Sequence, residues 1–361
     1  MPLSIALLDS WWQSPLTGSG TAVAIGGLER GLAALGHRVT RIRPENGGGH
    51  LAARLLFNLE LPRRVRQGAF DLVVGFDWDG FLVRPAPGQR YAVGLKGIVA
   101  DELRHERGLT RALLWLQACL EGRNARRASR VVTTSQYSRA VGIRAYRLPA
   151  ARVAAAPEGI DLAEWAPAAC PAPCPTILNV ARQYPRKNTA TLLDAVARLA
   201  EQVPRVRLRV VGDGPELPAL MARADRLGLR GRVAFLGAVS GPALRAEYAG
   251  AHLFCLPSRQ EGFGIAFLEA MAAGLPVVAG DAGAQPEVVG RAGVLVPPDD
   301  AAGLADTLGR LLADGALRAR LGAAGRARAA EFDWPRVAHR FLAAAGIGDN
   351  APHAPAPRLP A

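Results

Sequence analysis

The sequence predicts an α/β protein built from two similar domains. Short apolar runs rich in Val, Ile and Leu alternate with alanine-rich helical patterns almost from end to end, which is typical of βαβ units on a parallel sheet. The chain has 361 residues and half of them are hydrophobic, enough for two cores of ordinary size. Near the middle, the proline-rich residues 166–175 (APAACPAPCP) interrupt this alternation and predict a linker.

The first domain is predicted over residues 1–165. Its opening run, MPLSIALLDSWW, has no basic leader and is interrupted by Asp9, so we expect a first buried strand rather than a signal peptide. Apolar runs predict strands near residues 4–9, 38–43, 71–75, 91–95, 130–134 and 152–156. Helical periodicity predicts helices near residues 20–35, 51–66 and 109–127.

The second domain is predicted over residues 176–330. Its strands are expected near residues 176–181, 206–211, 232–236, 252–256, 276–279 and 293–296, with helices between them and further helices near 301–313 and 315–331. Residues 331–345 predict a last helix. The tail, residues 346–361, is rich in Pro and Ala and is expected to be disordered.

The formal net charge of +13 has two explanations that the sequence leaves open. It could indicate a polyanionic partner. Alternatively it reflects a compositional bias, because Lys96 and Lys187 are the only lysines in an arginine-rich chain that is also heavy in Ala, Gly and Pro. We expect no nucleic acid partner. Four scattered cysteines and the absence of a long apolar run favour a cytoplasmic protein without a zinc site or a membrane span.

Residues 257–276, PSRQEGFGIAFLEAMAAGLP, predict an anion site. A strand ends near Leu256 and a helix begins near Gly264. Gly262 and Gly264 let backbone N–H groups approach a ligand closely, and the helix directs its positive end at the same place. A phosphate or diphosphate is therefore the ligand that we expect there.

Two glutamates bracket this predicted site. Glu261 precedes the turn, while Glu269 lies inside the helix, whose side chains lean back toward its N-terminus. Carboxylates accept hydrogen bonds from the hydroxyl groups of a ribose or a hexose. An isolated glutamate on a helix usually faces solvent, but this helix offers Glu269 little other polar surface, so we expect it to have a partner.

A basic pair follows the first strand of the second domain. Arg182 and Lys187 lie in the segment ARQYPRKN, just past the strand end where open α/β sheets bind ligands. Both could contact a diphosphate and stabilise the charge of a departing nucleoside diphosphate, and this arrangement requires no metal. On its own the segment could equally be a solvated basic loop.

In these residues, the second half of the chain resembles the retaining glycosyltransferases of family 4, the glycosyl transferases group 1. Glu261 and Glu269 match that family's paired-glutamate motif, and Arg182 with Lys187 matches its diphosphate-binding pair. The segments VGDGPE (211–216), FLG (235–237) and AGLPVVA (273–279) fall where the family carries similar ones.

The resemblance implies a GT-B fold, with two Rossmann-like domains facing across a cleft and the last helix returning to the first domain. It implies that Glu261 contacts the transferred sugar and Glu269 the ribose. The backbone from Phe263 through Ile265 to Ala266 would hold the diphosphate. The implied activity is transfer from a nucleoside-diphosphate-sugar, with UDP slightly favoured as the base, retention of configuration, and no metal or other cofactor. Cell-envelope glycan, glycolipid or secondary-metabolite glycosylation would be its setting.

The first half of the chain resembles the family more loosely. The glycines Gly18 and Gly20 fall where the family has a loop near the donor phosphates, although such a turn is also common for structural reasons. Lys96 stands in a slot often held by histidine, which leaves an acid/base role there in doubt. Glu158 replaces an asparagine and could contact the donor or shape the hinge. Asp101 and Glu102 could line the acceptor side or form a solvated turn.

Other functions remain open from the sequence. Asp77 and Asp79 after a strand could be the paired-aspartate site of a metal-dependent glycosyltransferase. A sugar-nucleotide 2-epimerase shares the implied fold, and a non-catalytic nucleotide-sugar-binding protein would use the same pocket. A dehydrogenase is disfavoured because the glycines do not form the full dinucleotide fingerprint.

The acceptor is not identified by the sequence. Residues 51–66 carry Arg54, Arg63, Arg64 and Arg66 around Leu55, Leu56, Phe57 and Leu59, a pattern compatible with peripheral contact with an anionic membrane and a lipid-linked acceptor. A packed interior helix is the alternative. Trp11 and Trp12 could stack on an acceptor ring or belong to the core.

Overall fold

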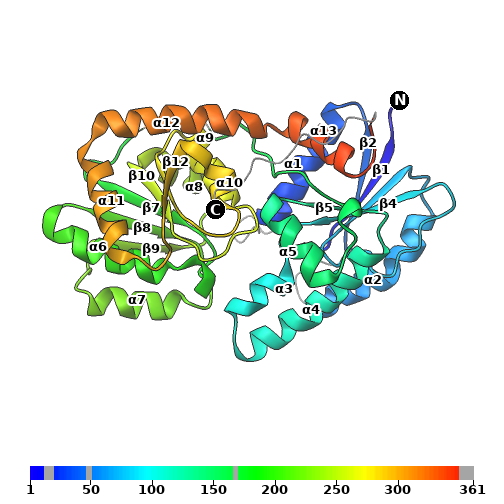
Figure 1. The fold of residues 1–361 in the computed structure, drawn as a ribbon, viewed down its shortest axis with the longest axis horizontal. Coiled ribbons are helices and arrows are strands. Elements are labelled where there is room, and N and C mark those ends of the chain that lie inside the picture. The colour runs from blue at the N-terminus through cyan, green and yellow to red at the C-terminus, as the bar shows by residue number, and fades with distance from the viewer. Residues whose placement is uncertain (12–19, 46–50, 166–169, 349–361) are drawn as a thin grey trace.

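The computed structural model of the protein describes residues 1–11, 20–45, 51–165 and 170–348. Figure 1 shows two lobes, each with a sheet covered by helices, and the last helices run from the second lobe onto the first. Each lobe contains a sheet of six strands, and every strand pairing is parallel. The predicted α/β architecture with two similar domains is confirmed.

The N-terminal domain has the strand order β2-β1-β3-β4-β5-β6. Its strands are β1 (Ser4–Leu8), β2 (Arg38–Ile42), β3 (Leu72–Phe76), β4 (Arg90–Leu95), β5 (Arg130–Thr133) and β6 (Val153–Ala155). Its helices are α1 (Gly20–Ala34), α2 (Leu51–Arg66), α3 (Val99–Glu102), α4 (Gly108–Arg127) and α5 (Gln136–Tyr146), with short 3₁₀ turns η1 (Leu103–His105) and η2 (Ala150–Arg152). Alternate residues of β1 enter cores on opposite faces of the sheet, as the period of a strand requires.

The C-terminal domain has the strand order β12-β11-β10-β7-β8-β9. Its strands are β7 (Thr176–Val180), β8 (Arg207–Val211), β9 (Val233–Gly237), β10 (Leu253–Leu256), β11 (Val277–Gly280) and β12 (Gly293–Val296). Its helices are α6 (Thr189–Gln202), α7 (Leu217–Arg226), α8 (Gly241–Gly250), α9 (Ile265–Ala272), α10 (Gln285–Val289), α11 (Ala301–Ala313) and α12 (Gly315–Ala329), with 3₁₀ turns η3 (Pro185–Lys187), η4 (Gly290–Ala292) and η5 (Ala330–Phe332).

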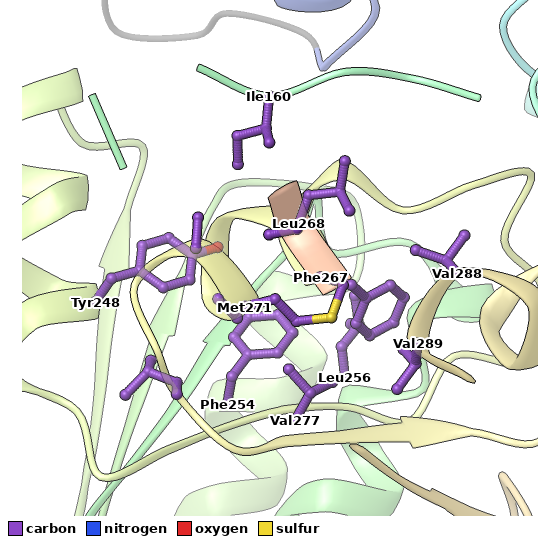
Figure 2. Packing of buried hydrophobic residues seen from close by; sticks show 14 of the residues in the cluster. Ile160, Tyr248, Phe254, Leu256, Phe267, Leu268, Met271, Val277, Val288 and Val289 are labelled. Carbon is purple, nitrogen blue, oxygen red and sulfur yellow. The ribbon is translucent and has the colours of Figure 1, made fainter. Parts of the chain in front are cut away.

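The core beside α9 is aromatic. Phe267 of α9 packs edge-on against Phe254 of β10, with ring centroids 5.9 Å apart, and Phe254 stacks on Tyr248 of α8. Figure 2 shows Met271 among these rings. This packing fixes the axis of α9 relative to the strand that precedes it, and so fixes where its N-terminus lies.

The last helix, α13 (Trp334–Ala344), returns to the N-terminal domain. The Trp334 ring lies against Gly27 of α1, where a Cβ would overlap the indole, and the Trp334 carbonyl lies 2.7 Å from where a Cβ on Gly31 would stand. Two glycines one turn apart therefore let the helices approach closely. The predicted crossing of the last helix is confirmed.

Several predictions need correction or stay open. Helix α5 was not among the predicted helices, although Ser135 caps it by accepting a hydrogen bond from the Ser138 N–H. The predicted domain limits at residues 165 and 176 stay predictions, because residues 166–169 lie outside the described ranges, as do residues 349–361 of the predicted tail. No helix within the described ranges has both the length and the apolar character needed to cross a bilayer.

Candidate active site

The turn that enters α9 depends on a glycine. Gly264 precedes the helix with φ of 93°, and a Cβ at this position would lie 2.6 Å from the Phe267 ring. The Phe267 N–H bonds back to the Gly264 carbonyl, which starts the helix. The N–H groups of Ile265 and Ala266, in the first turn, have no partner within the helix. The predicted anion site thus has the backbone geometry that it requires.

Glu261 and Lys187 form an ion pair in front of this turn. Lys187 Nζ lies 2.6 Å from Glu261 Oε1, and both side chains are largely buried. The Ser258 hydroxyl donates to the same carboxylate oxygen at 3.0 Å. The sequence predicted both residues for a donor site, and the structure brings them into direct contact although they are 74 positions apart.

Asn188 holds Lys187 in place. It adopts a left-handed conformation at the end of η3, and its side-chain amide donates to the carbonyl groups of Pro257 and Pro298. The Arg259 N–H also bonds to the Arg186 carbonyl at 2.8 Å. These contacts join the turn after β7 to the loop after β10. Sequence reasoning missed Asn188, whose signal was an asparagine between the basic turn and α6.

Arg182 lies on the open side of the site. It is exposed, and its guanidinium carbon lies 5.7 Å from the centroid of the Tyr184 ring. No carboxylate of the described residues lies within ion-pair distance of it. Arg182 therefore keeps its charge available, whereas Lys187 is neutralised by Glu261.

Glu269 has the partner that its apolar helix required. The buried Tyr248 hydroxyl donates to Glu269 Oε2 at 2.8 Å. Removal of solvent from this carboxyl raises its pKa to about 7, against which the Tyr248 hydrogen bond acts. The carboxyl therefore changes its charge near neutral pH.

The N-terminal domain meets the start of α9 at Gly20 and Ile265. The Ile265 side chain packs against the hydrophobic cores of both domains, and its Cδ1 lies 3.8 Å from where a Cβ on Gly20 would stand. Gly20, the first residue of α1, is thus beside the predicted diphosphate site. Gly18 lies outside the described residues.

Lys96 and Glu158 contact each other directly. Lys96 Nζ lies 2.9 and 3.0 Å from the two carboxylate oxygens of Glu158, and the ammonium lies 5.2 Å from the centroid of the Phe76 ring. Both side chains are buried, and with Trp334 they line a cavity with about 10 Å³ of free volume. The Lys96 ammonium is therefore already paired with a buried carboxylate.

A second set of contacts joins the two domains, and the sequence did not predict it. The Gly262 carbonyl accepts hydrogen bonds from the hydroxyl groups of Thr134 (3.0 Å), Ser135 (2.8 Å) and Ser138 (3.0 Å). Glu287 of α10 accepts the N–H of Gln136 at 2.8 Å, at the start of α5. The signal in the sequence was a run of hydroxyl side chains after β5, at the same sheet edge as the ends of its parallel neighbours.

Asp101 and Glu102 also face the other domain. Gln260 donates to Asp101 at 3.2 Å, and Arg186 pairs with Glu102 at 3.2 Å and with Glu106 at 3.7 Å. Of the two alternatives left open for these residues, the structure disfavours the solvated turn, because Asp101 contacts the loop after β10 and Glu102 pairs with the turn after β7.

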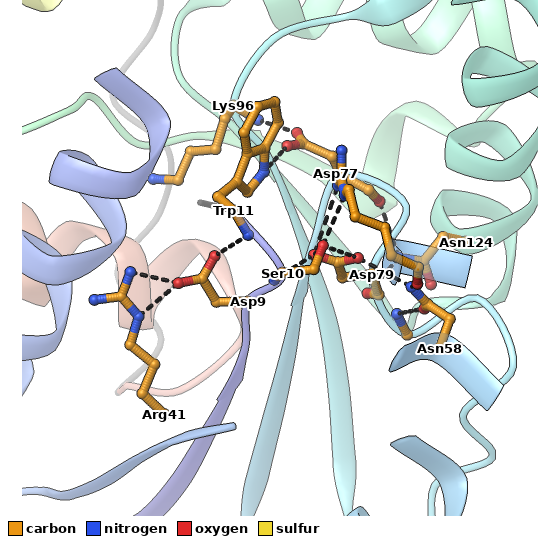
Figure 3. Close-up of polar contacts among 11 residues, drawn as sticks. Asp9, Ser10, Trp11, Arg41, Asn58, Asp77, Asp79, Lys96 and Asn124 are labelled. Atoms are coloured by element: carbon orange, nitrogen blue, oxygen red, sulfur yellow. Dashed lines mark hydrogen bonds and ion pairs between the residues drawn. The ribbon is translucent and has the colours of Figure 1, made fainter. Parts of the chain in front are cut away.

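Asp77 and Asp79 serve the packing of the N-terminal domain, as Figure 3 shows. Asp79 accepts hydrogen bonds from Ser10 and Asn58, while Asp77 accepts from the Trp11 indole at 3.0 Å and the Lys96 N–H at 2.8 Å. Burial raises the pKa of Asp77 to about 6. With their oxygens occupied by these donors, the two carboxylates give no support to the paired-aspartate alternative.

Helix α2 only partly matches the predicted membrane helix. Arg54 is buried between the rings of Trp11 (4.7 Å) and Trp78 (4.2 Å), and Phe57 is also buried. Leu56 and Leu59 are exposed. Trp11 belongs to this interior cluster, so of its two open alternatives the structure favours the core, and Trp12 lies outside the described residues.

Part of the chain is similar in sequence to known proteins. Residues 174–314 match the family model "Glycosyl transferases group 1". Over 161 residues the chain is 38% identical to the GDP-mannose-dependent alpha-(1-6)-phosphatidylinositol monomannoside mannosyltransferase of Mycolicibacterium smegmatis, covering 42% of each chain. Over 198 residues it is 38% identical to the phosphatidyl-myo-inositol mannosyltransferase of Mycobacterium tuberculosis, covering 52% of each. The chain spans about half the length of the curated relatives that it matches.

A likeness to solved structures extends over nearly the whole chain. Sucrose-phosphate synthase from Thermosynechococcus elongatus superimposes with a TM-score of 0.77 at 24% identity, covering 94% of this chain and 97% of that one. This likeness shows the GT-B fold. Residues 174–314 thus match the glycosyl transferases group 1 model, and the chain that carries them has the two-domain GT-B fold that the resemblance implied.

Proposed function

We propose that the protein transfers a sugar from a nucleoside-diphosphate-sugar to an acceptor, with retention of anomeric configuration and without a metal ion or other cofactor. The observation that carries this proposal is the Lys187–Glu261 pair set before the N-terminus of α9. A cation, a carboxylate and a row of free N–H groups meet there, and each suits a different part of a sugar nucleotide. The match of residues 174–314 to the group 1 model supports it.

The diphosphate would lie against the first turn of α9. The N–H groups from Phe263 to Ala266, with the glycines Gly262 and Gly264, can donate to phosphate oxygens, and the helix dipole favours a negative charge there. Arg182 and Lys187 would contact the same group. As the bond to the sugar breaks, negative charge grows on the departing nucleoside diphosphate, and these fixed donors stabilise it.

The two glutamates would hold the sugars on either side. Glu261, once Lys187 turns to the phosphate, presents a buried carboxylate to hydroxyl groups of the transferred sugar. Glu269 would accept from the ribose hydroxyls and requires its ionised form to do so. Lys96 would act with Glu158 to shape the cleft wall rather than to move a proton, because its charge is already paired.

The names of the relatives suggest which donor and acceptor to test first. The Mycolicibacterium smegmatis relative is called GDP-mannose-dependent, so GDP-mannose ranks above the UDP-sugars that the resemblance slightly favoured. Both relatives are named for phosphatidylinositol-based acceptors, which favours a lipid-linked acceptor in cell-envelope glycolipid synthesis. We propose a cytoplasmic protein in peripheral contact with an anionic membrane and without a nucleic acid partner.

A thermal-shift panel tests this function. UDP, GDP, ADP, NAD and their sugar conjugates are compared with and without a chelator, on the wild type, Glu269→Ala and the matched control Glu201→Ala, an exposed glutamate of α6. We expect one nucleoside diphosphate to stabilise the wild type and the control equally, with the chelator present, and the Glu269→Ala variant less. Stabilisation by none of them, or only with a divalent ion, contradicts the proposal. Analysis of the products formed from the stabilising sugar nucleotide separates the alternatives. An epimerised free product identifies the 2-epimerase, and binding without transfer or hydrolysis identifies a non-catalytic protein.

A further inference from the structure

Helix α4 exposes an unusual amount of apolar surface. Ten large hydrophobic side chains are exposed among the described residues, and four of them lie on α4. Their exposed fractions are Leu109 75%, Leu113 42%, Trp115 62% and Leu116 38%. A soluble domain normally scatters such residues singly, so four on one helix indicate an interaction surface.

These four residues do not belong to the face that packs on the domain. Ala118, Glu121, Gly122, Asn124 and Ala125 form the buried side of α4. Leu109, Leu113 and Leu116 follow one another at four and three positions, which places them on one stripe of a helix, while Trp115 projects about 100° around the helix from Leu116. We call these four side chains the outer face of α4. The predicted helix at residues 109–127 did not reveal it, because helical periodicity alone does not tell which face is covered.

The exposed charged residues from 107 to 127 are all arginines. Arg107, Arg111 and Arg123 are exposed at the margins of the outer face. The sole carboxylate from residue 107 to residue 127 is that of Glu121, which is fully buried on the opposite side, where burial raises its pKa well above the ordinary value. Leucines and a tryptophan bordered by arginines match the surface of a helix that lies in a membrane interface.

We propose that the outer face of α4 docks on an anionic membrane, with Trp115 and the leucines among the lipid headgroups and the arginines against their phosphates. Charge complementarity selects this occupant over a second copy of the chain. A symmetric self-contact would set the arginines of one copy against those of the other with no carboxylate between them. A negatively charged lipid surface supplies both the apolar phase and the counter-charge.

The position of α4 connects this surface to the candidate active site. The α3–η1 segment directly before α4 carries Glu102, which pairs with Arg186 across the two domains, and Glu106 follows it with a second contact to Arg186. Figure 1 shows α3 and α4 together at the lower end of the N-terminal lobe, on the side nearer the other lobe. Docking would therefore bring the junction between the domains close to the membrane. The proposal rests on the membrane contact in the proposed function and names the surface that makes it, but it does not depend on the transfer reaction.

Vesicle co-sedimentation of the full chain tests the proposal. The vesicles are phosphatidylcholine alone, or phosphatidylcholine with about 30% phosphatidylglycerol. We expect the wild type to bind the anionic vesicles, and Trp115→Ser/Leu116→Ser to lose about tenfold or more in partition coefficient. Arg107→Gln/Arg111→Gln should lose about tenfold on anionic vesicles. Leu56→Ser/Leu59→Ser on α2 is the matched control, since those leucines are equally exposed, and it should retain most of the binding.

Tryptophan quenching supplies an independent readout of depth. Lipids brominated on their acyl chains should quench the wild type, and Trp115→Phe should remove most of that quenching, because Trp78, Trp165 and Trp334 are buried and Trp11 packs on Arg54 and Asp77. A Trp12→Phe variant is the control for the remaining tryptophan. Equal binding to neutral and anionic vesicles, unchanged binding of the Trp115→Ser/Leu116→Ser variant, or loss only in the α2 control would overturn the proposal. The proposal would also be overturned if light scattering showed a wild-type dimer that the Trp115→Ser/Leu116→Ser variant dissociates. Each variant should keep the nucleotide thermal shift, so failure of docking and failure of the proposed function are distinguishable.

Discussion

Lys187 Nζ and Glu261 Oε1 lie 2.6 Å apart at the start of α9, so the cation expected to bind a diphosphate is held by the carboxylate expected to bind a sugar. Of the basic pair, Arg182 alone is free of such a partner among the described residues. A nucleoside diphosphate must therefore compete with Glu261 for Lys187. In the unliganded protein the carboxylate takes the place of the phosphate.

This competition makes opposite predictions for binding and for transfer. In Glu261→Gln, Lys187 loses its internal counter-charge, so we expect the free nucleoside diphosphate to bind about 3- to 10-fold more tightly by calorimetry. Transfer should fall about 100-fold or more, because the amide cannot replace the carboxylate at the sugar. Glu201→Gln is the control. Weaker nucleotide binding by Glu261→Gln would refute the competition.

Glu269 makes the stability of the fold depend on pH. Its pKa of about 7 lies above the ordinary value of 4.5, so the folded protein holds this proton more tightly than the unfolded chain does. The resulting stabilisation is fully present below about pH 4.5 and is lost as the pH rises through about 7. Denaturant unfolding at several pH values should show a steeper loss in the wild type than in Glu269→Gln.

The comparison with Glu269→Gln isolates this group. Asp77 also has a raised pKa, of about 6, and contributes a loss of the same sign, but it is present in both proteins. The difference between the two curves therefore belongs to Glu269 and its Tyr248 hydrogen bond. Parallel curves across this pH range would show that Glu269 does not titrate in it.

The Lys96–Glu158 pair should behave as a coupled unit. Lys96→Met leaves a buried carboxylate unpaired, and we expect it to cost about 3–5 kcal/mol in the free energy of unfolding. The double variant Lys96→Met/Glu158→Gln should recover a large part of that loss, because no unpaired charge remains. A double-mutant cycle by denaturant unfolding measures the coupling. Strictly additive losses would mean that the two side chains do not stabilise each other.

The Glu287 contact to α5 should favour the closed arrangement of the domains. Its carboxylate accepts the Gln136 N–H at the positive end of that helix, an interaction worth about 0.3–1 kcal/mol. We expect Glu287→Gln to increase the radius of gyration in X-ray scattering without ligand. Glu331→Gln, which removes a pair with Arg328 within the same domain, is the control. If Glu287→Gln and the wild type have the same radius of gyration, the Glu287 contact does not hold the domains together, and the Gly262 contacts do so instead.

The sequence could predict what local pattern encodes. The strands have the period and apolar runs of a parallel sheet, and Gly264 before α9 marks a turn that favours glycine. The ends of parallel strands meet at one edge, so Lys187 and Glu261 could be placed together before their contact was seen. These parts of the fold and site depend on residues close in sequence or on general topology.

Contacts between residues distant in sequence could not be predicted. Lys96 and Glu158 were each recognised as unusual, but nothing in a single sequence pairs side chains 62 positions apart. The Gln136–Glu287 contact spans 151 positions. The two alternatives for α2 stayed open for the same reason, because Arg54 packs in the interior against Trp11 and Trp78, residues on two other segments. The apolar stripe of α4 stayed exposed for lack of any such partner.

Release of nucleoside diphosphate from GDP-mannose tests the central claim most directly. The assay uses the full chain with a chelator, a phosphatidylinositol-containing acceptor, and UDP-sugars in parallel, on the wild type, Lys187→Ala and Glu201→Ala. We predict release from one sugar nucleotide by the wild type and the Glu201→Ala control, and a loss of about 100-fold or more in Lys187→Ala. No release from any sugar nucleotide, release that requires a divalent ion, or full activity in Lys187→Ala would contradict this account of the site.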